Sequence, residues 1–376
     1  MLLLSGPNLN GNELKYVTEC IETGWVSSVG SYVDKFEKMT AEFAGTQYAV
    51  ATSSGTTALH TCLILLGVCE NDMVISPNIT FIATLNSIKY TGATPLLIDA
   101  DEKNWQMDLD LLEEFLAGET FQKEGSCFHK KTGKRIPVIM PVHVLGKMCD
   151  MDRLLSLTGK NKIAIIEDST EALGSFYKGK HAGSFGLLGT FSYNGNKIIT
   201  TGGGGMIVTN NETLAKRAKH LTTQAKSDPF EYIHDDIGYN YRLVNVAAAM
   251  GVAQMEQLPG FLQRKKEIIN FYKRELSGVG DIEFQQVDGD VNPNWWMPTI
   301  KTEKQREVLK ILNDNKMQSR PFWVPMNQLR MFSNEIYFTK SDRSDFLYKH
   351  CLSIPCSTNI TDDDLISVCK KIKEAY

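Results

Sequence analysis

Short apolar runs of strand length alternate with segments of helical spacing over roughly the first two hundred residues. The runs at 72–77, 136–146 and 162–170 are rich in Val, Ile and Leu, and the segment that follows the run at 48–54 has helical spacing. Strands that are apolar on both faces and alternate with helices form mostly parallel sheets covered on both sides. The sequence therefore predicts an α/β fold built on a mostly parallel sheet.

A second, smaller domain is expected, because 376 residues exceed what one hydrophobic core usually serves. We predict a large domain at residues 1–250 and a small α+β C-terminal domain at 251–376, with a helix that joins the two and an N-terminal segment that packs on the small domain. Pro259 lies inside that helix and is expected to kink or break it. The polar segment 117–135 is predicted to be a surface loop.

Composition excludes several classes of protein. The net charge of −4 gives no basic excess for nucleic-acid binding, and no run of eighteen apolar residues could span a membrane. The apolar run at the start is too short for a signal peptide and has no basic leader. The eight cysteines form no C-x-x-C pair and no zinc-type spacing with histidine. We therefore expect a cytoplasmic protein without a metal site, a nucleic-acid partner or a membrane partner.

The segment "SSGTTALH", residues 53–60, follows a predicted strand and opens a predicted helix. The first backbone N–H groups of a helix have no partner within it, and the helix dipole favours an anion there. Gly55 and Thr56 are therefore candidates for binding a phosphate group. An ordinary helix cap explains the same residues equally well.

Two further segments carry residues suited to chemistry. Glu167 and Asp168 end an apolar strand, where open α/β sheets place ligand-binding groups, although a helix cap is the simpler explanation. Lys197 lies in "FSYNGNKIITTGGGGMIVT", shortly before the four glycines 202–205, and a glycine run often marks a close approach to the backbone. An enclosed lysine is a Schiff-base nucleophile, whereas an exposed one would merely cover the sheet with its stem.

Together these three features match the needs of pyridoxal 5'-phosphate (PLP). The helix start suits its phosphate, the strand-end carboxylate suits its ring nitrogen, and the lysine suits its aldehyde. The sequence has no P-loop motif, and its glycine run precedes a strand-like segment rather than a helix, which argues against a dinucleotide site.

The motifs also resemble, in order, those of the DegT-type sugar-nucleotide aminotransferases. The matching segments cover nearly the whole chain and include "SSGTTALH", "PVHVLG", "EDSTEALGS", "FSYNGNKIITTGGGGMIVT" and "GYNYRLVNVAAAM". The resemblance implies fold type I and PLP, which becomes pyridoxamine 5'-phosphate between half-reactions. It implies transfer of an amino group from L-glutamate to C4 of a nucleotide-linked 4-keto-6-deoxy sugar, with UDP-linked N-acetylhexosamines as the nearest substrates. It further implies a homodimer with shared active sites and a place in bacterial surface-glycan, including lipopolysaccharide, biosynthesis.

The resemblance also implies roles for individual residues. Lys197 would form the Schiff base, Asp168 would pair with the ring nitrogen, and Glu171 would approach the ring hydroxyl, where many relatives have Gln or His. The remaining positions divide into three groups: cofactor contacts from the same chain at Gly55, Thr56, Phe81 and Ser192; a contact with the neighbouring subunit's cofactor phosphate at Asn240; and substrate contacts at Ser28, Arg242, Arg320 and Asn327. The chain departs from the family where "GEGG" becomes glycine at 202–205 and where His becomes Asn327.

Two alternative functions, and one open question about a pair of tryptophans, remain at this stage; a plain nucleotide-binding scaffold is supported by no fingerprint. A sugar dehydratase of the same fold would carry histidine in place of Lys197. A non-catalytic regulator would bind a sugar nucleotide or the cofactor without turnover. Trp295 and Trp296, in "NWWMPTI", could stack on a nucleotide base or pack between the two domains.

Overall fold

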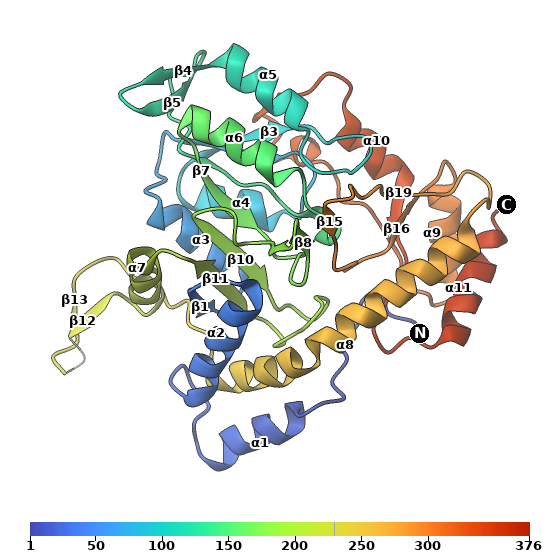
Figure 1. Cartoon of the computed structure of the whole chain (residues 1–376), viewed down its shortest axis with the longest axis horizontal. Helices are drawn as coiled ribbons and strands as arrows, with labels where there is room; N and C mark the ends of the chain where they lie inside the picture. Colours follow the sequence, from blue (N-terminus) through green and yellow to red (C-terminus); the bar gives the residue numbers. More distant parts are fainter. Residues whose placement is uncertain (229) are drawn as a thin grey trace.

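The computed structural model describes residues 1–228 and 230–376 and is organised around one large twisted sheet (Figure 1). The sheet has eight strands in the order β1-β11-β10-β7-β6-β2-β3-β18. Only β11 runs antiparallel to its neighbours, so the sheet is mostly parallel, as predicted. The strands are β1 (Tyr48–Thr52), β2 (Met73–Pro77), β3 (Thr94–Ile98), β6 (Val138–Ile139), β7 (Ala164–Asp168), β10 (Leu188–Ser192), β11 (Gly205–Thr209) and β18 (Ile336–Phe338).

Helices cover both faces of this sheet because its strands present apolar side chains to both sides. Val74 and Ile166 pack on one face with α3 (Gly55–Leu65), α4 (Ala83–Tyr90) and α7 (Glu212–Thr222). Ile75 and Ile165 pack on the other face with α5 (Leu109–Glu119) and α6 (Met151–Asn161). A further cluster joins the β10–β11 region of that face to α2 (Ser31–Ala44) and α8 (Asn245–Leu276). Two-sided burial thus accounts for the continuous apolar runs.

The C-terminal part forms a separate antiparallel sheet of four strands in the order β14-β16-β19-β17. Its strands are β14 (Glu283–Phe284), β16 (Thr299–Lys301), β17 (Arg320–Pro321) and β19 (Cys351–Ser353), accompanied by α9 (Gln305–Asp314), α10 (Arg343–His350) and α11 (Asp362–Lys373). Leu2 pairs with Met317 and the N–H of Cys356 donates to the carbonyl of Leu4, so the N-terminal segment lies against this part. Strand β18, although it falls in the range expected for the small domain, extends the large sheet through β3. The division at residue 250 stays a prediction.

Helix α8 is 32 residues long and runs from the large sheet to the C-terminal part (Figure 1). It continues through Pro259, so a break there is wrong, whereas a kink stays a prediction. A proline inside a helix costs about 3 kcal/mol. Buried residues on both sides of it, including Met255, Leu258, Phe261 and Ile268, anchor the helix and offset that cost.

Smaller elements complete the chain. The segment 117–135, predicted to be a loop, contains a β-hairpin instead, in which Phe121 stacks on Phe128. The hairpin is β4 (Thr120–Lys123) with β5 (Ser126–His129); the other elements are α1 (Glu13–Glu22), β8 (Phe176–Tyr177), β9 (Lys180–His181), β12 (Lys226–Asp228), β13 (Ile233–His234), β15 (Val291–Asn292) and the 3-10 turns η1 (Val144–Gly146) and η2 (Met326–Gln328).

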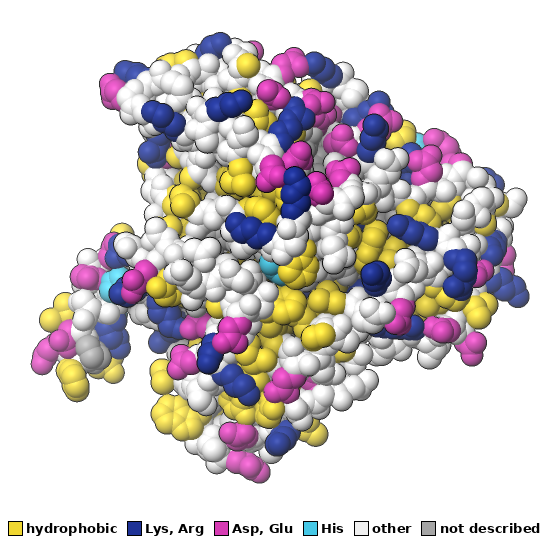
Figure 2. Space-filling view, viewed as in Figure 1, with side chains coloured by type: hydrophobic (Ala, Val, Ile, Leu, Met, Phe, Trp, Pro, Cys, Tyr) yellow, Lys and Arg dark blue, Asp and Glu magenta, His cyan; other side chains and the backbone are white. Residues whose placement is uncertain are grey.

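The surface view shows charges of both signs interspersed over the face presented (Figure 2). No helix in the described ranges is long and apolar enough to cross a membrane. Within the same ranges, no group of His, Cys, Asp and Glu side chains is arranged to hold a metal ion.

Candidate active site

A cavity of about 400 Å³ opens where the N-terminus of α3 and the ends of β7 and β10 meet the C-terminal part. The large sheet contributes the residues that follow its strands, and the chain ends contribute apolar walls. The lining residues from the large sheet include Ser54, Gly55, Thr56, Phe81, Thr170, Glu171, Ser192, Lys197, Gly203 and Gly204; those from the chain ends include Leu4, Trp296, Met297, Arg320, Phe322, Trp323 and Ser353.

The start of α3 is both capped and open. The Ser54 hydroxyl accepts from the N–H of Thr57, and the Thr57 hydroxyl accepts from the N–H of Ser54. The cap therefore uses the third backbone N–H of the helix, whereas the first two, of Gly55 and Thr56, remain available at the cavity. A Cβ at Gly55 would lie 2.9 Å from the Cβ of Ser192. The absence of a side chain at Gly55 thus keeps a small polar cradle between the helix start and the end of β10.

Asp168 ends β7 and is 2% exposed. Its Oδ2 accepts from the Thr84 hydroxyl at 2.7 Å, and its Oδ1 accepts from the Thr170 hydroxyl at 2.7 Å and the Thr170 N–H at 3.2 Å. These contacts fix the orientation of the carboxyl group directly behind the cavity wall that Thr170 and Glu171 form.

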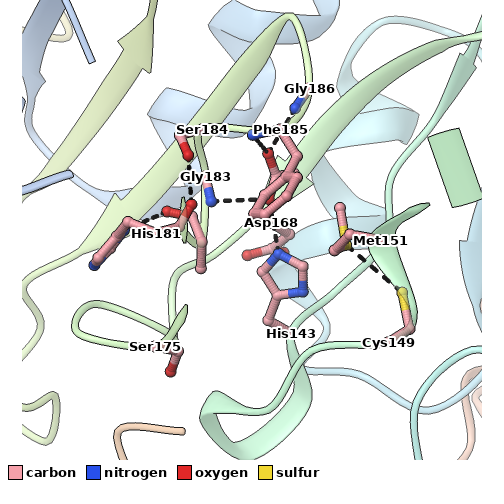
Figure 3. A network of polar contacts seen from close by, with 12 residues as sticks. His143, Cys149, Met151, Asp168, Ser175, His181, Gly183, Ser184, Phe185 and Gly186 are labelled. Atoms are coloured by element: carbon pink, nitrogen blue, oxygen red, sulfur yellow. Dashed lines mark hydrogen bonds and ion pairs between the residues drawn. The ribbon is translucent and has the colours of Figure 1, made fainter. Parts of the chain in front are cut away.

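The neighbouring carboxyl, Glu167, hydrogen-bonds to His143, Gly183 and Gly186, which are labelled in Figure 3, and not to the two threonines that hold Asp168. Its oxygens accept from His143 Nε2 at 2.9 Å and from the N–H groups of Gly183 and Gly186 at 2.8 and 2.7 Å. Burial opposes ionisation of Glu167, but these hydrogen bonds outweigh it and hold its pKa below the usual value. Glu167 therefore supports the loop before β10. Successive strand residues point to opposite faces, which is the sequence signal that could have separated it from Asp168.

Lys197 lies in the turn after β10, and its side chain is 13% exposed. Its Nζ is 3.9 Å from Glu171 Oε1 and 4.0 Å from the centre of the Trp296 ring. Burial lowers the pKa of Lys197, and the charges of Glu171 and Asp168 oppose that shift. An amine of lowered pKa beside a buried carboxyl group of raised pKa can exchange a proton with it.

Glu171 is 3% exposed, and burial raises its pKa to about 7 against the opposing charge of Lys197. Its Oε2 accepts from the N–H of Leu145 at 2.8 Å. That N–H is turned towards the site by left-handed backbone at Leu145 (φ 58°) and Gly146 (φ 77°). The "PVHVLG" motif therefore has a structural role in orienting Glu171.

The glycine run after Lys197 serves a close approach of backbone to backbone. A Cβ at Gly205 would lie 2.3 Å from the carbonyl oxygen of Ser54 and 2.7 Å from the nitrogen of Gly55. Gly203 and Gly204 line the cavity. The run thus lets β11 pass directly against the start of α3.

Of the twelve residues to which the resemblance gives roles, seven line the cavity, Asp168 hydrogen-bonds to Thr170 in the cavity wall without lining it, and four lie outside. Those that line it are Gly55, Thr56, Phe81, Glu171, Ser192, Lys197 and Arg320. Ser28, Asn240, Arg242 and Asn327 do not line it. Asn327 forms a reciprocal pair with Asn78, whose amide donates to Asn327 Oδ1 at 2.9 Å and accepts from the N–H of Asn327 at 3.0 Å. Asn240 pairs with Thr223, and Arg242 pairs with Thr52, through isolated antiparallel β-bridges of the backbone.

Sequence reasoning missed most of the residues that reach the cavity from the chain ends. Leu4, Phe322 and Trp323 carry no local pattern that indicates a site, and only the tertiary arrangement brings them there. Trp296 is one of the two tryptophans that the sequence singles out, and the structure places its ring against Lys197. The ring of Trp295 lies near Lys147 and Lys273 instead.

The residues present fit PLP. Open amides and a hydroxyl at the start of α3 suit a phosphate, an oriented carboxyl group suits a pyridine nitrogen, and an enclosed amine suits an aldehyde. The cradle that a Cβ at Gly55 would fill is the most specific of these features.

Comparison with known proteins agrees with a PLP site. The chain matches the model of the DegT/DnrJ/EryC1/StrS aminotransferase family over residues 7–373. It is 39% identical over 373 residues to the GDP-perosamine synthase of Escherichia coli O157:H7, covering 98% of this chain and 97% of that protein. It is 37% identical over 330 residues to the GDP-perosamine synthase of Caulobacter vibrioides, covering 86% and 85%.

Solved structures share the fold. Helicobacter pylori PseC, an aminotransferase involved in the biosynthesis of pseudoaminic acid, aligns with a TM-score of 0.88 at 24% identity, covering 100% of this chain and 99% of that one. The sugar aminotransferase CalS13 of Micromonospora echinospora aligns with a TM-score of 0.88 at 23% identity and covers 100% of both chains. The chain therefore belongs to the DegT/DnrJ/EryC1/StrS aminotransferase family and is a PLP-dependent sugar aminotransferase of fold type I.

Proposed function

We propose that the protein transfers the amino group of L-glutamate to C4 of a GDP-linked 4-keto-6-deoxy sugar. Three relatives that are 33% to 39% identical carry the name GDP-perosamine synthase, which denotes a GDP-linked 4-amino sugar as product. The observation that carries the reaction class is the convergence of Lys197, Glu171 and the start of α3 on one cavity. The GDP-linked substrate replaces the UDP-linked N-acetylhexosamine expected from the motifs, which remains the comparison substrate in the test below.

Bound PLP supplies an aldehyde that carries the amino group between substrates and a ring that withdraws electrons. We assign its phosphate to the N–H groups of Gly55 and Thr56 and to the Ser192 hydroxyl, and the face of its ring to Phe81, which is 54% exposed at the cavity. Lys197 would hold the aldehyde through its amine.

Asp168 would hold the proton of the ring nitrogen. The hydroxyls of Thr84 and Thr170 each donate to one of its oxygens, so the carboxyl group cannot rotate freely. Oδ1 accepts a second hydrogen bond from the Thr170 N–H, whereas Oδ2 retains acceptor capacity for the ring N–H. Each unit by which a carboxylate raises the pKa of such a proton is worth about 1.4 kcal/mol in favour of the protonated form.

Lys197, once displaced by the amino donor, would move the proton from the donor Cα. Its lowered pKa favours the neutral amine that this step needs. Glu171, whose pKa burial raises to about 7, would donate to the ring hydroxyl in its protonated form.

Arg320 is the cation we assign to the carboxylate of L-glutamate or the diphosphate of the sugar nucleotide. It lines the cavity, and its planar guanidinium suits either anion. Ser28, Arg242 and Asn327 would complete the substrate site, and Asn240 would reach the cofactor phosphate of a second copy in a homodimer. Trp25, Val26 and Val29, around Ser28, are 45% to 65% exposed, which supports cover by a partner on that surface.

The test is to load the protein with PLP, convert it with L-glutamate, and add keto sugars singly. The visible absorption of the aldehyde form should disappear with L-glutamate and return with a GDP-linked 4-keto-6-deoxy sugar, and NMR of the product should place the new amine at C4. Return of the absorption with only the UDP-linked N-acetyl sugar would contradict the nucleotide assignment. No change with L-glutamate would contradict the amino donor.

A further inference from the structure

The amine of Lys197 lies against the face of an aromatic ring, that of Trp296, which comes from the C-terminal part of the chain. Nζ is 4.0 Å from the centre of the Trp296 ring, and Trp296 is only 3% exposed. Within the described chain, no hydrogen bond holds Nζ, and its ion pair with Glu171 spans 3.9 Å. The indole face and the Glu171 carboxyl group are therefore the two buried surfaces that lie beside this amine.

Hydrogen bonds from several parts of the chain fix Trp296 itself. Its indole Nε1–H donates to the carbonyl of Asn196 at 2.7 Å, one residue before the lysine. Its backbone N–H donates to Asn294 Oδ1 at 2.9 Å, and its carbonyl accepts from Lys265 Nζ at 2.8 Å. Lys265 belongs to α8, so the ring is tied to both the lysine turn and the long helix.

Asn294, which accepts from the Trp296 N–H, also contacts Glu171, the ion-pair partner of Lys197. The Asn294 side-chain amide donates to the carbonyls of Glu171 and Leu173 at 2.8 and 2.9 Å. Asn294 fits there only because Gly146 has no side chain, since a Cβ at Gly146 would lie 1.8 Å from Asn294 Oδ1. Trp296, Glu171 and Lys197 are thus held in one hydrogen-bonded frame.

We infer that Trp296 is a positioning residue for Lys197: its indole face holds the amine at the cavity and excludes water from that side. A cation beside an aromatic face is attracted to it, and a neutral amine beside the same face is kept dry. This inference rests on the role proposed for Lys197. It goes further in making the approach of a C-terminal segment a condition for the correct placement of the amine.

The first test uses the cofactor-free protein. Competitive acetylation with acetic anhydride, quantified by mass spectrometry of the Lys197 peptide, measures how accessible and how basic the amine is. Trp296→Leu should raise the labelling rate of Lys197 about fivefold, because the wall is removed. Trp295→Leu is the matched control, since that ring faces Lys147 and Lys273, and it should leave the rate unchanged. An unchanged rate in Trp296→Leu would overturn the inference.

The second test uses Trp296→Met, whose flexible side chain can adapt to the gap if the leucine variant folds poorly. In the PLP-loaded protein the rate of the L-glutamate half-reaction should fall roughly tenfold with an unchanged KM for L-glutamate, and Trp296→Phe should restore most of it. A rise in KM alone would assign Trp296 to substrate binding and reject the positioning role. The acetylation result does not depend on PLP, so it stands or falls separately from the proposed function.

Discussion

Two enclosed lysines, Lys197 and Lys147, lie beside consecutive tryptophans in very different surroundings. Lys147 is 4% exposed, its Nζ contacts Gln285 Oε1, and it lies 4.9 Å from the Trp295 ring. Burial lowers the pKa of both lysines. For Lys147 the positive charge of Lys273 lowers it further, whereas for Lys197 two carboxyl groups oppose the shift.

The comparison shows that enclosure does not by itself make a lysine reactive. Lys197 has a cavity in front of it, a carboxyl group of raised pKa beside it and the start of α3 nearby. Lys147 is not among the residues that line this cavity. The reactivity expected of Lys197 therefore depends on the cavity and on the carboxyl group beside it. Lys147, which is buried but lies outside the cavity, shows what burial alone does to a lysine.

Removing the amine of Lys197 should have the largest effect. Lys197→Ala should lower turnover at least about a thousandfold, because the variant loses the amine that we assign to taking the proton from the donor Cα. Steady-state assay with L-glutamate and the keto sugar measures this. Appreciable turnover by the variant would reject the distinction between the two lysines.

Asp168→Asn should have the next largest effect. The amide still accepts a hydrogen bond from Thr84 or Thr170 but carries no charge to retain the ring proton, so the L-glutamate half-reaction should slow roughly a hundredfold. Stopped-flow absorbance measures the rate. Glu167→Gln, at the adjacent position, is expected to lower stability instead, because Glu167 accepts from His143 and the loop amides. Loss of the half-reaction rate in a stable Glu167→Gln protein would contradict this separation.

Glu171→Gln should change the pH dependence of stability. The pKa of Glu171 in the folded protein is about 7, above its ordinary value of 4.5, so its contribution is fully present below pH 4.5 and is lost as pH rises through 7. Glutamine stays neutral and can still accept from the N–H of Leu145. The variant should therefore melt at a higher temperature than the parent above pH 7 and show no such gain below pH 4.5. Calorimetry measures the melting temperatures of both proteins over this pH range. A constant difference between the two melting temperatures at every pH would contradict the raised pKa.

Lys147→Met should have the smallest effect. It replaces an enclosed amine by an apolar side chain and leaves Gln285 without this partner, so the free energy of unfolding should change by less than about 2 kcal/mol. Turnover should stay within about twofold of the parent. A large loss of turnover without loss of stability would give Lys147 a role that the structure does not indicate.

Much of the fold and the inner site follows from the sequence, because both depend on local pattern. Apolar runs define the strands, and parallel strands bring the residues after their carboxyl ends, such as Glu171 and Lys197, to one edge. The hairpin at 117–135 was missed because its polar, lysine-rich composition hides the pairing of Phe121 with Phe128. Pro259 does not break α8, because tertiary packing along the helix outweighs a local penalty.

The outer site could not be predicted in the same way. Leu4, Trp296 and Trp323 reach the cavity from distant parts of the chain, and no periodicity in one segment indicates where another will lie. Ser28, Asn240 and Arg242 lie outside the cavity of a single chain, and their roles stay predictions that depend on a second copy.

The most direct measurement reduces the PLP-loaded protein with borohydride and locates the modified lysine by peptide mass spectrometry. Reduction fixes the cofactor covalently to whichever amine holds it. Our account predicts the pyridoxyl group on Lys197 and an unmodified Lys147. A pyridoxyl group on Lys147 or any other lysine, with Lys197 unmodified, would contradict it.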